Sequence, residues 1–167
     1  MKQLILFAAI VISVFSCTSP NDQRSSENLA IAKRYMNAVE TNNVEAMDSL
    51  LADNYVGYGP SVGDSINKAD AIASFKDNAA NLYEYIKYTR YQNIAVTVTK
   101  KDEADPGDWV SNWANLTIKY KDGRGPVNIW VNATYKIENG KIVRSITFYN
   151  EADVLRQLGY TIEPPKE

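Results

Sequence analysis

Hydrophobic positions recur every three or four residues in three separate stretches between residues 25 and 82, and this spacing predicts three helices. The first extends from a serine cap at Ser25 or Ser26 to about Thr41. The second is shorter, and its expected buried side consists of Val44, Met47, Leu50 and Leu51. The third begins after Asn67 and keeps the helical period to Leu82.

Alternation of apolar and polar residues replaces the helical period in the second half of the chain. It predicts strands over residues 94–98, 109–120, 126–137 and 141–149, in addition to a short extended segment at 55–58. Asn139-Gly140 is typical of a two-residue hairpin turn. A short helix follows from Glu151 to Leu158. Helices followed by a run of long strands indicate an α+β fold with an antiparallel sheet.

The two faces of the predicted sheet differ in composition. One face is apolar and is expected to pack against the helices. The opposite face is nominally polar, yet it carries all the tryptophans of the chain, Trp109, Trp113 and Trp130. Because aromatic residues are enriched in interface cores, we expect a homodimer that forms through this face. The alternative is that the C-terminal helix or neighbouring side chains partly cover the tryptophans.

The N-terminus carries the features of a secretory signal peptide. Lys2 precedes an apolar run that ends at Phe15, which is too short to span a membrane. Val14-Phe-Ser-Cys17 resembles the lipobox of bacterial lipoproteins, in which the cysteine is lipidated and becomes the first residue. Thr18 and Ser19 then suggest the outer membrane, with the domain facing the periplasm. We therefore predict a signal peptide over 1–16, a lipidated Cys17 with a flexible tether over 17–26, and one domain over 27–163.

Composition restricts the possible chemistry. The 167 residues include one cysteine and no histidine, which excludes histidine-dependent triads and internal disulfides. The net charge of −2 offers no basic field for nucleic acid. Acidic residues between 102 and 108 do not follow calcium-loop spacing, so we interpret them as a solvated hairpin tip. We expect no metal and no cofactor.

A family resemblance follows from the order of elements and from short local matches. The matches are Ile31-Ala-Lys-Arg-Tyr-Met36, Leu51-Ala-Asp-Asn54, residues 140–149 and Leu155-Arg-Gln-Leu-Gly159. Over about residues 27–160 the chain resembles the SnoaL-like branch of the nuclear transport factor 2-like superfamily. The resemblance implies a cone-shaped α+β barrel, in which a strongly curved sheet and the N-terminal helices enclose an apolar pocket. The superfamily includes ketosteroid isomerase, polyketide cyclases, epoxide hydrolases and non-catalytic binding domains, so the fold alone does not select a function.

The catalytic positions of the related enzymes are mostly vacant. Against ketosteroid isomerase, Tyr35 matches a donor, but Gly59 stands at the position of the base and Ala133 at that of the second donor. Against the cyclases, the expected histidine and acidic positions hold Ser145, Thr147 and Asn150. Arg144 points outward by its parity, so the epoxide-hydrolase arrangement is absent as well. Because hydroxyls are poor acid–base groups near neutral pH, we expect a domain without catalysis.

The implied pocket would be lined mainly by phenols and hydrocarbon. The candidates are Tyr35, Tyr55, Tyr58, Phe75, Ala133, Tyr135, Ser145 and Tyr149. Such a lining suits a small apolar ligand, but the same tyrosines could instead pack a closed core with paired hydroxyls. A partner protein is the other expected ligand, and an envelope scaffold is a further possibility. The rival hypothesis is an isomerase, cyclase or dehydratase that uses Tyr35 with Asp53 or Asp64 as its base.

Overall fold

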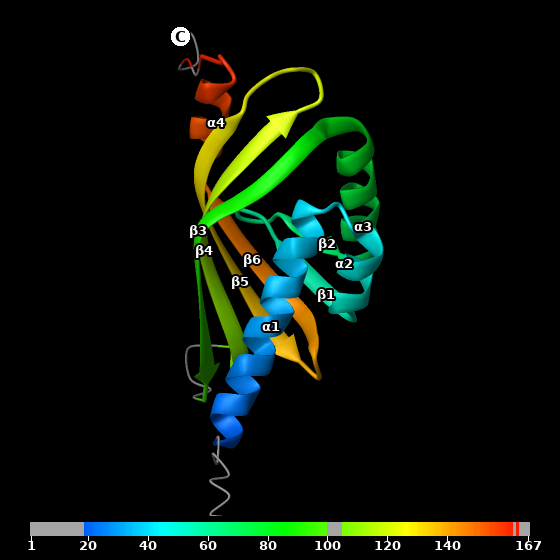
Figure 1. Ribbon diagram of the computed structural model, residues 1–167, viewed down its shortest axis with the longest axis vertical. Coiled ribbons are helices and arrows are strands. Elements are labelled where there is room, and N and C mark those ends of the chain that lie inside the picture. The colour runs from blue at the N-terminus through cyan, green and yellow to red at the C-terminus, as the bar shows by residue number, and fades with distance from the viewer. Residues whose placement is uncertain (1–18, 100–104, 162, 164–167) are drawn as a thin grey trace, which may run out of the picture.

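The computed structural model describes residues 19–99, 105–161 and 163. Cys17, the predicted lipidation site, lies outside these residues. Within them the chain forms four α-helices and six strands (Figure 1). The helices are α1 (Pro20–Glu40), α2 (Val44–Leu50), α3 (Lys68–Asp77) and α4 (Glu151–Gln157). The strands are β1 (Leu51–Tyr58), β2 (Ser65–Asn67), β3 (Tyr83–Val98), β4 (Gly107–Tyr120), β5 (Val127–Glu138) and β6 (Lys141–Tyr149).

Helix α1 begins before the predicted serine cap at Ser25 or Ser26. The hydroxyl of Ser19 accepts a hydrogen bond from the backbone N–H of Asp22 and so caps the helix. Pro20 occupies the first turn, where its missing N–H costs no helical hydrogen bond. The prediction of a flexible tether up to residue 26 is therefore wrong from Pro20 onward, because these residues continue α1.

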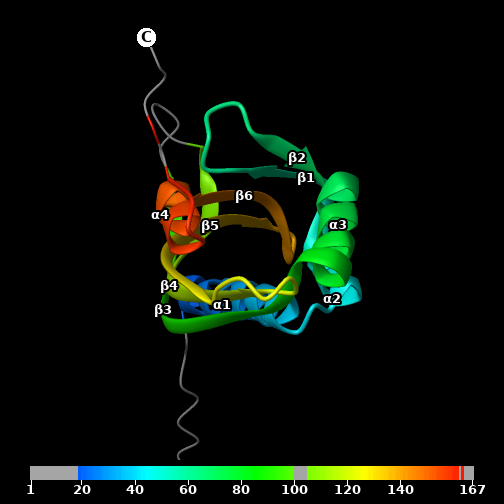
Figure 2. The ribbon, with the colours of Figure 1, turned by 90° about the horizontal axis from the view of Figure 1, so that it is seen from above.

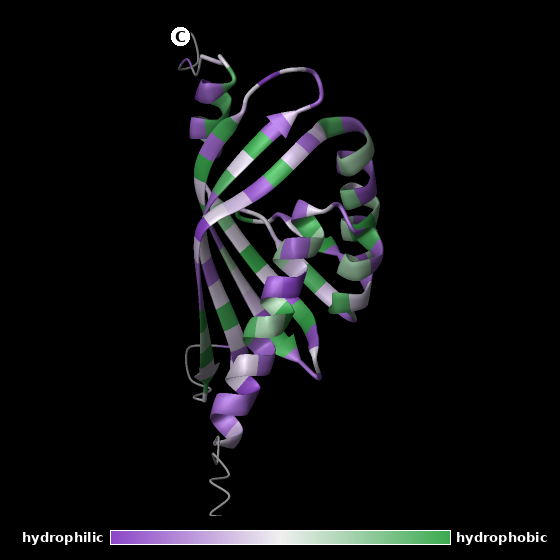
Figure 3. Cartoon of the chain, in the orientation of Figure 1, coloured by the Kyte–Doolittle hydropathy of each residue, from purple (hydrophilic) through white to green (hydrophobic). Residues whose placement is uncertain are grey.

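The sheet has the strand order β2-β1-β6-β5-β4-β3 and does not close on itself. Neighbouring strands are antiparallel, except that β1 and β6 run parallel. Seen from above, the sheet bends strongly, and α1, α2 and α3 lie on its concave side (Figure 2). This architecture confirms the predicted α+β fold with a curved sheet wrapped around the N-terminal helices. Apolar and polar residues alternate along β4 and β5, as the colours of Figure 3 show.

Two regions were predicted incompletely. Strand β3 begins at Tyr83, although alternation predicts a strand only over residues 94–98. Arg90 adopts a positive φ of 50° at an irregularity in the β3–β4 register, which interrupts the alternation. The third helix ends at Asp77, and a single π-type turn from Asn78 to Leu82 leads into β3.

The concave face of the sheet carries the apolar core in two adjoining clusters. The first joins α1, α2 and β1 to the sheet through Tyr35, Met47, Leu51, Val110 and Ile142, all of which are buried. The second lies toward α4 and includes Leu116, Ile118, Val127 and Ile129. Among the described residues, no helix combines the length and apolar character that a membrane crossing requires.

Candidate functional site

The inner face of the sheet brings together five of the predicted pocket residues. Tyr35, Tyr55, Ala133, Tyr135 and Ser145 are all buried. The rings of Tyr35 and Tyr135 meet edge to face with centroids 5.6 Å apart. The hydroxyls of Tyr55 and Ser145 are 2.7 Å apart and share a hydrogen bond. These residues therefore form a cluster of packed rings that contains one hydroxyl pair, Tyr55 with Ser145.

The phenols of this inner face are poor proton acceptors. Burial raises the pKa of Tyr35 and of Tyr135 well above 10. Burial also raises the pKa of Tyr55, although its hydrogen bond with Ser145 partly opposes the shift. The pKa of Tyr88 rises to about 12 because the side chain is buried and lies near the carboxylate of Glu40. These tyrosines hold their protons at neutral pH and can donate a hydrogen bond, but they cannot act as bases.

The other three predicted pocket residues lie in different surroundings. Phe75 contacts Tyr35 from α3, with ring centroids 6.4 Å apart. Tyr149 is partly exposed at the end of β6 beside α4. Tyr58 is on the outer face of the sheet, since it pairs with Ile146 and its ring lies 5.9 Å from the guanidinium of Arg144. The prediction that Tyr58 lines the pocket is wrong, because the residues of β1 that face the core are Tyr55 and Gly57, and Tyr58 points to the opposite side.

The two candidate bases differ in position. Asp53 is fully exposed and lies 3.3 Å from the Lys68 ammonium. Asp64 lies in the turn between β1 and β2, where its backbone carbonyl accepts a hydrogen bond from the N–H of Gly59. A Cβ built on Gly59 would be 3.2 Å from an Asp64 carboxylate oxygen. The Asp64 carboxylate therefore occupies the space that a side chain at position 59 would use.

The outer face of the sheet exposes a group of large apolar side chains. We call it the aromatic face and define it by Trp113, Trp130, Phe148, Ile94 and Val96. The strand registers place these five residues on the side opposite to the core. Trp113, Trp130 and Phe148 are 42%, 61% and 54% exposed.

The third tryptophan does not belong to this surface. Trp109 is only 9% exposed, and its indole N–H donates to the backbone carbonyl of Asp105 at 3.0 Å. Asp105 is held by Lys136, at 2.7 Å, and by Arg144. The hydrogen bond with Lys136 and the charge of Arg144 lower the pKa of the Asp105 carboxyl. The interpretation of the acidic residues as a solvated hairpin tip is therefore wrong for Asp105. Its carboxylate binds Lys136 and Arg144, and its backbone carbonyl accepts the hydrogen bond from Trp109.

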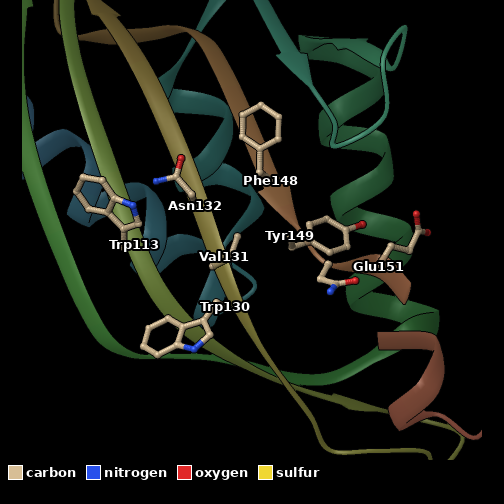
Figure 4. Close-up of a pocket in the computed structure, with 8 residues that line it drawn as sticks. Trp113, Trp130, Val131, Asn132, Phe148, Tyr149 and Glu151 are labelled. Atoms are coloured by element: carbon tan, nitrogen blue, oxygen red, sulfur yellow. The ribbon is translucent and has the colours of Figure 1, made fainter. Parts of the chain in front are cut away.

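A shallow groove of about 640 Å³ crosses one end of the aromatic face (Figure 4). Trp113, Trp130, Asn132 and Phe148 line it from β4, β5 and β6, and Tyr149 and Glu151 line it near the start of α4. Sequence reasoning missed Phe148 and Glu151 as surface residues of this site. The position of Phe148 on the outer face could have been inferred from the alternation along β6. The register pairs Phe148 with Asn132 and Asn132 with Trp113, so all three side chains lie on the same face of the sheet.

Carboxylates do not gather into a metal site in the part of the chain that the structure describes. No group of three or more His, Cys, Asp or Glu side chains there is arranged to hold an ion. The side chains of Asn112 and Asn93 share a hydrogen bond of 2.8 Å, while the buried atoms Asn112 Oδ1 and Asn93 Nδ2 have no hydrogen-bond partner within the described ranges.

A curved, unclosed six-strand sheet folded over an N-terminal helix defines the nuclear transport factor 2-like cone. The SnoaL-like domain family within this class matches residues 32–145, and the chain belongs to this family. No curated protein matches the chain.

Solved structures with the same fold have diverse assignments. An LEH-like epoxide hydrolase of Mycobacterium tuberculosis is 16% identical, with a TM-score of 0.61 over 81% of this chain and 91% of that one. A protein assigned as a polyketide cyclase from Pseudomonas putida is 17% identical, with a TM-score of 0.60 over 77% and 95%. A protein assigned as an isomerase from Bacillus subtilis is 14% identical, with a TM-score of 0.60 over 80% and 94%. At these identities the similarity establishes the fold alone.

Proposed function

We propose that the chain is a non-catalytic binding domain of the bacterial envelope, anchored through Cys17, which binds a second copy of itself through the aromatic face. The observation that carries this proposal is the contrast between the two faces of the sheet. The inner face buries Tyr35, Tyr55 and Tyr135, whereas the outer face exposes Trp113, Trp130 and Phe148. Contiguous exposed aromatic residues of this kind favour a protein interface over a solvated surface.

Light scattering on the purified protein tests the dimer. We expect a dimer mass at micromolar concentration. Replacing Trp130 with serine removes a large apolar side chain from each copy, which should cost about 2 kcal/mol per side chain and about 4 kcal/mol per dimer, or a Kd weaker by roughly several hundred-fold. Val62→Ser is the matched control, because Val62 is fully exposed but lies outside the aromatic face. A monomeric mass for the unmodified protein contradicts the proposal.

Small apolar molecules are the alternative ligand, and they would enter the inner face. Because the rings of Tyr35 and Tyr135 pack edge to face and the Tyr55 hydroxyl already pairs with Ser145, we expect no stabilisation by steroids, fatty acids or aromatic compounds in a thermal shift assay. A concentration-dependent rise in Tm that Tyr35→Phe alters would instead support a ligand pocket.

The anchor has its own test. Labelled palmitate should enter the protein and disappear from it in Cys17→Ser. Retention of label in that variant would contradict lipidation at Cys17. Thermal stability of the domain should be the same in both proteins, because the residues that form its core begin in α1, after Cys17.

A second candidate function is an enzyme of the isomerase, cyclase or dehydratase type. It is favoured by the Asp64 carboxylate, which takes up the space beside Gly59 where the ketosteroid isomerase resemblance places a base. Asp64→Asn tests this possibility against a panel of enolisable ketones. Proton exchange that the unmodified protein catalyses and Asp64→Asn does not would establish catalysis. Equal background rates for the two proteins would exclude Asp64 as a base.

A further inference from the structure

Helix α1 is a rigid extension of the domain core toward the N-terminus. Its second half contributes Ile31, Ala32, Tyr35 and Met36 to the core, all buried. Its first turns, from Pro20 to Glu27, are polar and mostly exposed, and they continue the same helix without a break. The N-terminal end of α1 therefore moves together with the sheet.

Very little chain separates this helix from the predicted anchor. Ser19 is the cap of α1, so only Thr18 stands between the cap and Cys17. Two residues extend over about 7 Å at most. A lipid on Cys17 would hold the start of α1 close to the bilayer surface, with no long linker to let the domain turn over freely.

The N-terminal part of α1 marks one end of the molecule. Arg24 forms an ion pair with Asp108 at the start of β4, with 3.7 Å between nitrogen and oxygen. A cleft of about 550 Å³ separates this part of α1 from the β5–β6 hairpin at residues 137–140. Helix α4 lies at the opposite end of the long axis (Figure 1). There the Gln157 side chain makes two hydrogen bonds with the Asn128 backbone, of 2.8 and 2.9 Å.

We propose that the membrane-facing surface of this protein is the end formed by the first turns of α1, Gly107–Asp108 and the β5–β6 hairpin. The proposal rests on the proposed acylation of Cys17. It places α4 and the Trp130–Glu151 groove on the side away from the bilayer. The ten residue steps along β5 from Asn128 to Glu138 span up to about 33 Å, which sets the scale of that separation. The groove then meets molecules from the aqueous compartment and not lipids of its own membrane.

The charges at this end indicate that the lipid, and not electrostatic attraction, holds the protein there. The cleft beside α1 has one cation, Arg24, and three carboxylates, Glu27, Asp108 and Glu138. Such a surface gains nothing from anionic lipid headgroups, which attract clusters of lysine and arginine. Attachment should therefore not depend on the anionic lipid content of the membrane.

Two variants, each with one added cysteine, test the orientation in the full acylated chain. Glu138→Cys and Ala152→Cys both introduce an exposed thiol, the first at the β5–β6 hairpin and the second on α4. The natural Cys17 is blocked by its lipid, so a donor dye labels only the new position. After reconstitution into phosphatidylcholine vesicles with an acceptor dye on the lipid headgroups, we expect energy transfer at position 138 to be several-fold greater than at position 152.

Each outcome has a defined meaning. Equal transfer at the two positions, or greater transfer at 152, overturns the orientation while leaving the anchor intact. Mass spectrometry of the same samples shows whether the acyl chains are present, and their absence overturns both the anchor and the orientation. Vesicles with and without phosphatidylglycerol should give the same ratio of transfer. Binding of Cys17→Ser to anionic vesicles would contradict a lipid-only attachment.

Discussion

Replacing Tyr55 with phenylalanine removes the hydroxyl that forms the interior hydrogen bond with Ser145. The two oxygens are 2.7 Å apart, and both side chains are buried. The substitution keeps the aromatic ring and its packing, so it isolates the hydrogen bond from the surrounding core. Ser145 also stands at a position where the cyclase resemblance places a reactive group, so the result bears directly on the packed-core interpretation.

The magnitude follows from the cost of an unpaired buried hydroxyl. Tyr55→Phe loses a net hydrogen bond and leaves the Ser145 hydroxyl without its partner, which should lower the free energy of unfolding by about 2 kcal/mol. Ser145→Ala leaves the Tyr55 hydroxyl unpaired and should cost a similar amount, about 2 kcal/mol. In the double variant neither hydroxyl is left alone. Its cost should therefore be smaller than the sum of the single costs by about 1 to 2 kcal/mol.

Urea unfolding of the four proteins measures this coupling. The midpoint should shift while the slope of the transition stays constant, since the surface exposed on unfolding barely changes. Costs that add to within about 0.3 kcal/mol would refute the reasoning, because residues that share a hydrogen bond cannot act independently. A stabilising Tyr55→Phe would point instead to a hydroxyl that is kept for a ligand at the expense of stability.

Three further predictions follow from the same contacts. Gly57→Ala should lower the free energy of unfolding by about 1 to 3 kcal/mol, because the added Cβ would lie 2.5 Å from the Tyr55 hydroxyl. Urea unfolding of the double variant with Tyr55→Phe should show that part of this cost is relieved. Lys136 and then Arg144 lower the pKa of the Asp105 carboxyl. The ionised carboxylate therefore stabilises the folded protein above pH 3.8, its ordinary pKa, and this contribution is lost as the pH falls through the lower pKa of the folded state. As it is lost, Trp109 fluorescence should shift to the red in the unmodified protein, whereas in Asp105→Asn it should already be shifted at pH 7. Burial raises the pKa of Tyr88 and of Tyr83 to about 12, so the unfolded chain loses phenol protons near pH 10 while the folded chain retains them. The free energy of unfolding should therefore fall between pH 10 and 12. A urea midpoint that stays constant over that range contradicts the burial of these phenols.

The alternation in the second half of the chain was sufficient to predict most of the sheet. Strand β6 begins and ends at the predicted residues, and β4 and β5 agree to within two residues at each end. These strands have one buried and one exposed face, so the pleat imposes a strict period of two. Strand β3 was predicted only in its last part because it lies at the edge of the sheet, carries many polar residues and contains the irregularity at Arg90.

The candidate site was less accessible to sequence reasoning. Periodicity gives the face on which a residue lies, but it does not show whether a neighbouring segment covers that face. Trp109 has the same parity as Trp113, yet Asp105 closes over Trp109 and leaves Trp113 open. Tyr55 and Tyr58 could not both face the pocket, because residues three positions apart on a strand point to opposite faces. The ring contact between Tyr35 and Tyr135 could not be predicted either, since packing depends on how side chains from α1 and β5 meet.

The proposed anchor and the proposed dimer together restrict how two copies can meet. Two sheets that pack face to face through the same surface are related by a twofold axis lying in the interface plane. If both copies are anchored in one bilayer, the N-terminal ends of their α1 helices must point the same way. The twofold axis must then run along the membrane normal. Each residue of the aromatic face would therefore lie at the same distance from the bilayer as the residues that it contacts in the partner. Trp130 would lie near its own counterpart, far from the bilayer, while the Lys136–Asp105–Arg144 cluster would meet its copy near the membrane. Because Asp105 neutralises part of that positive charge, the parallel arrangement avoids the repulsion that lysine and arginine alone would cause.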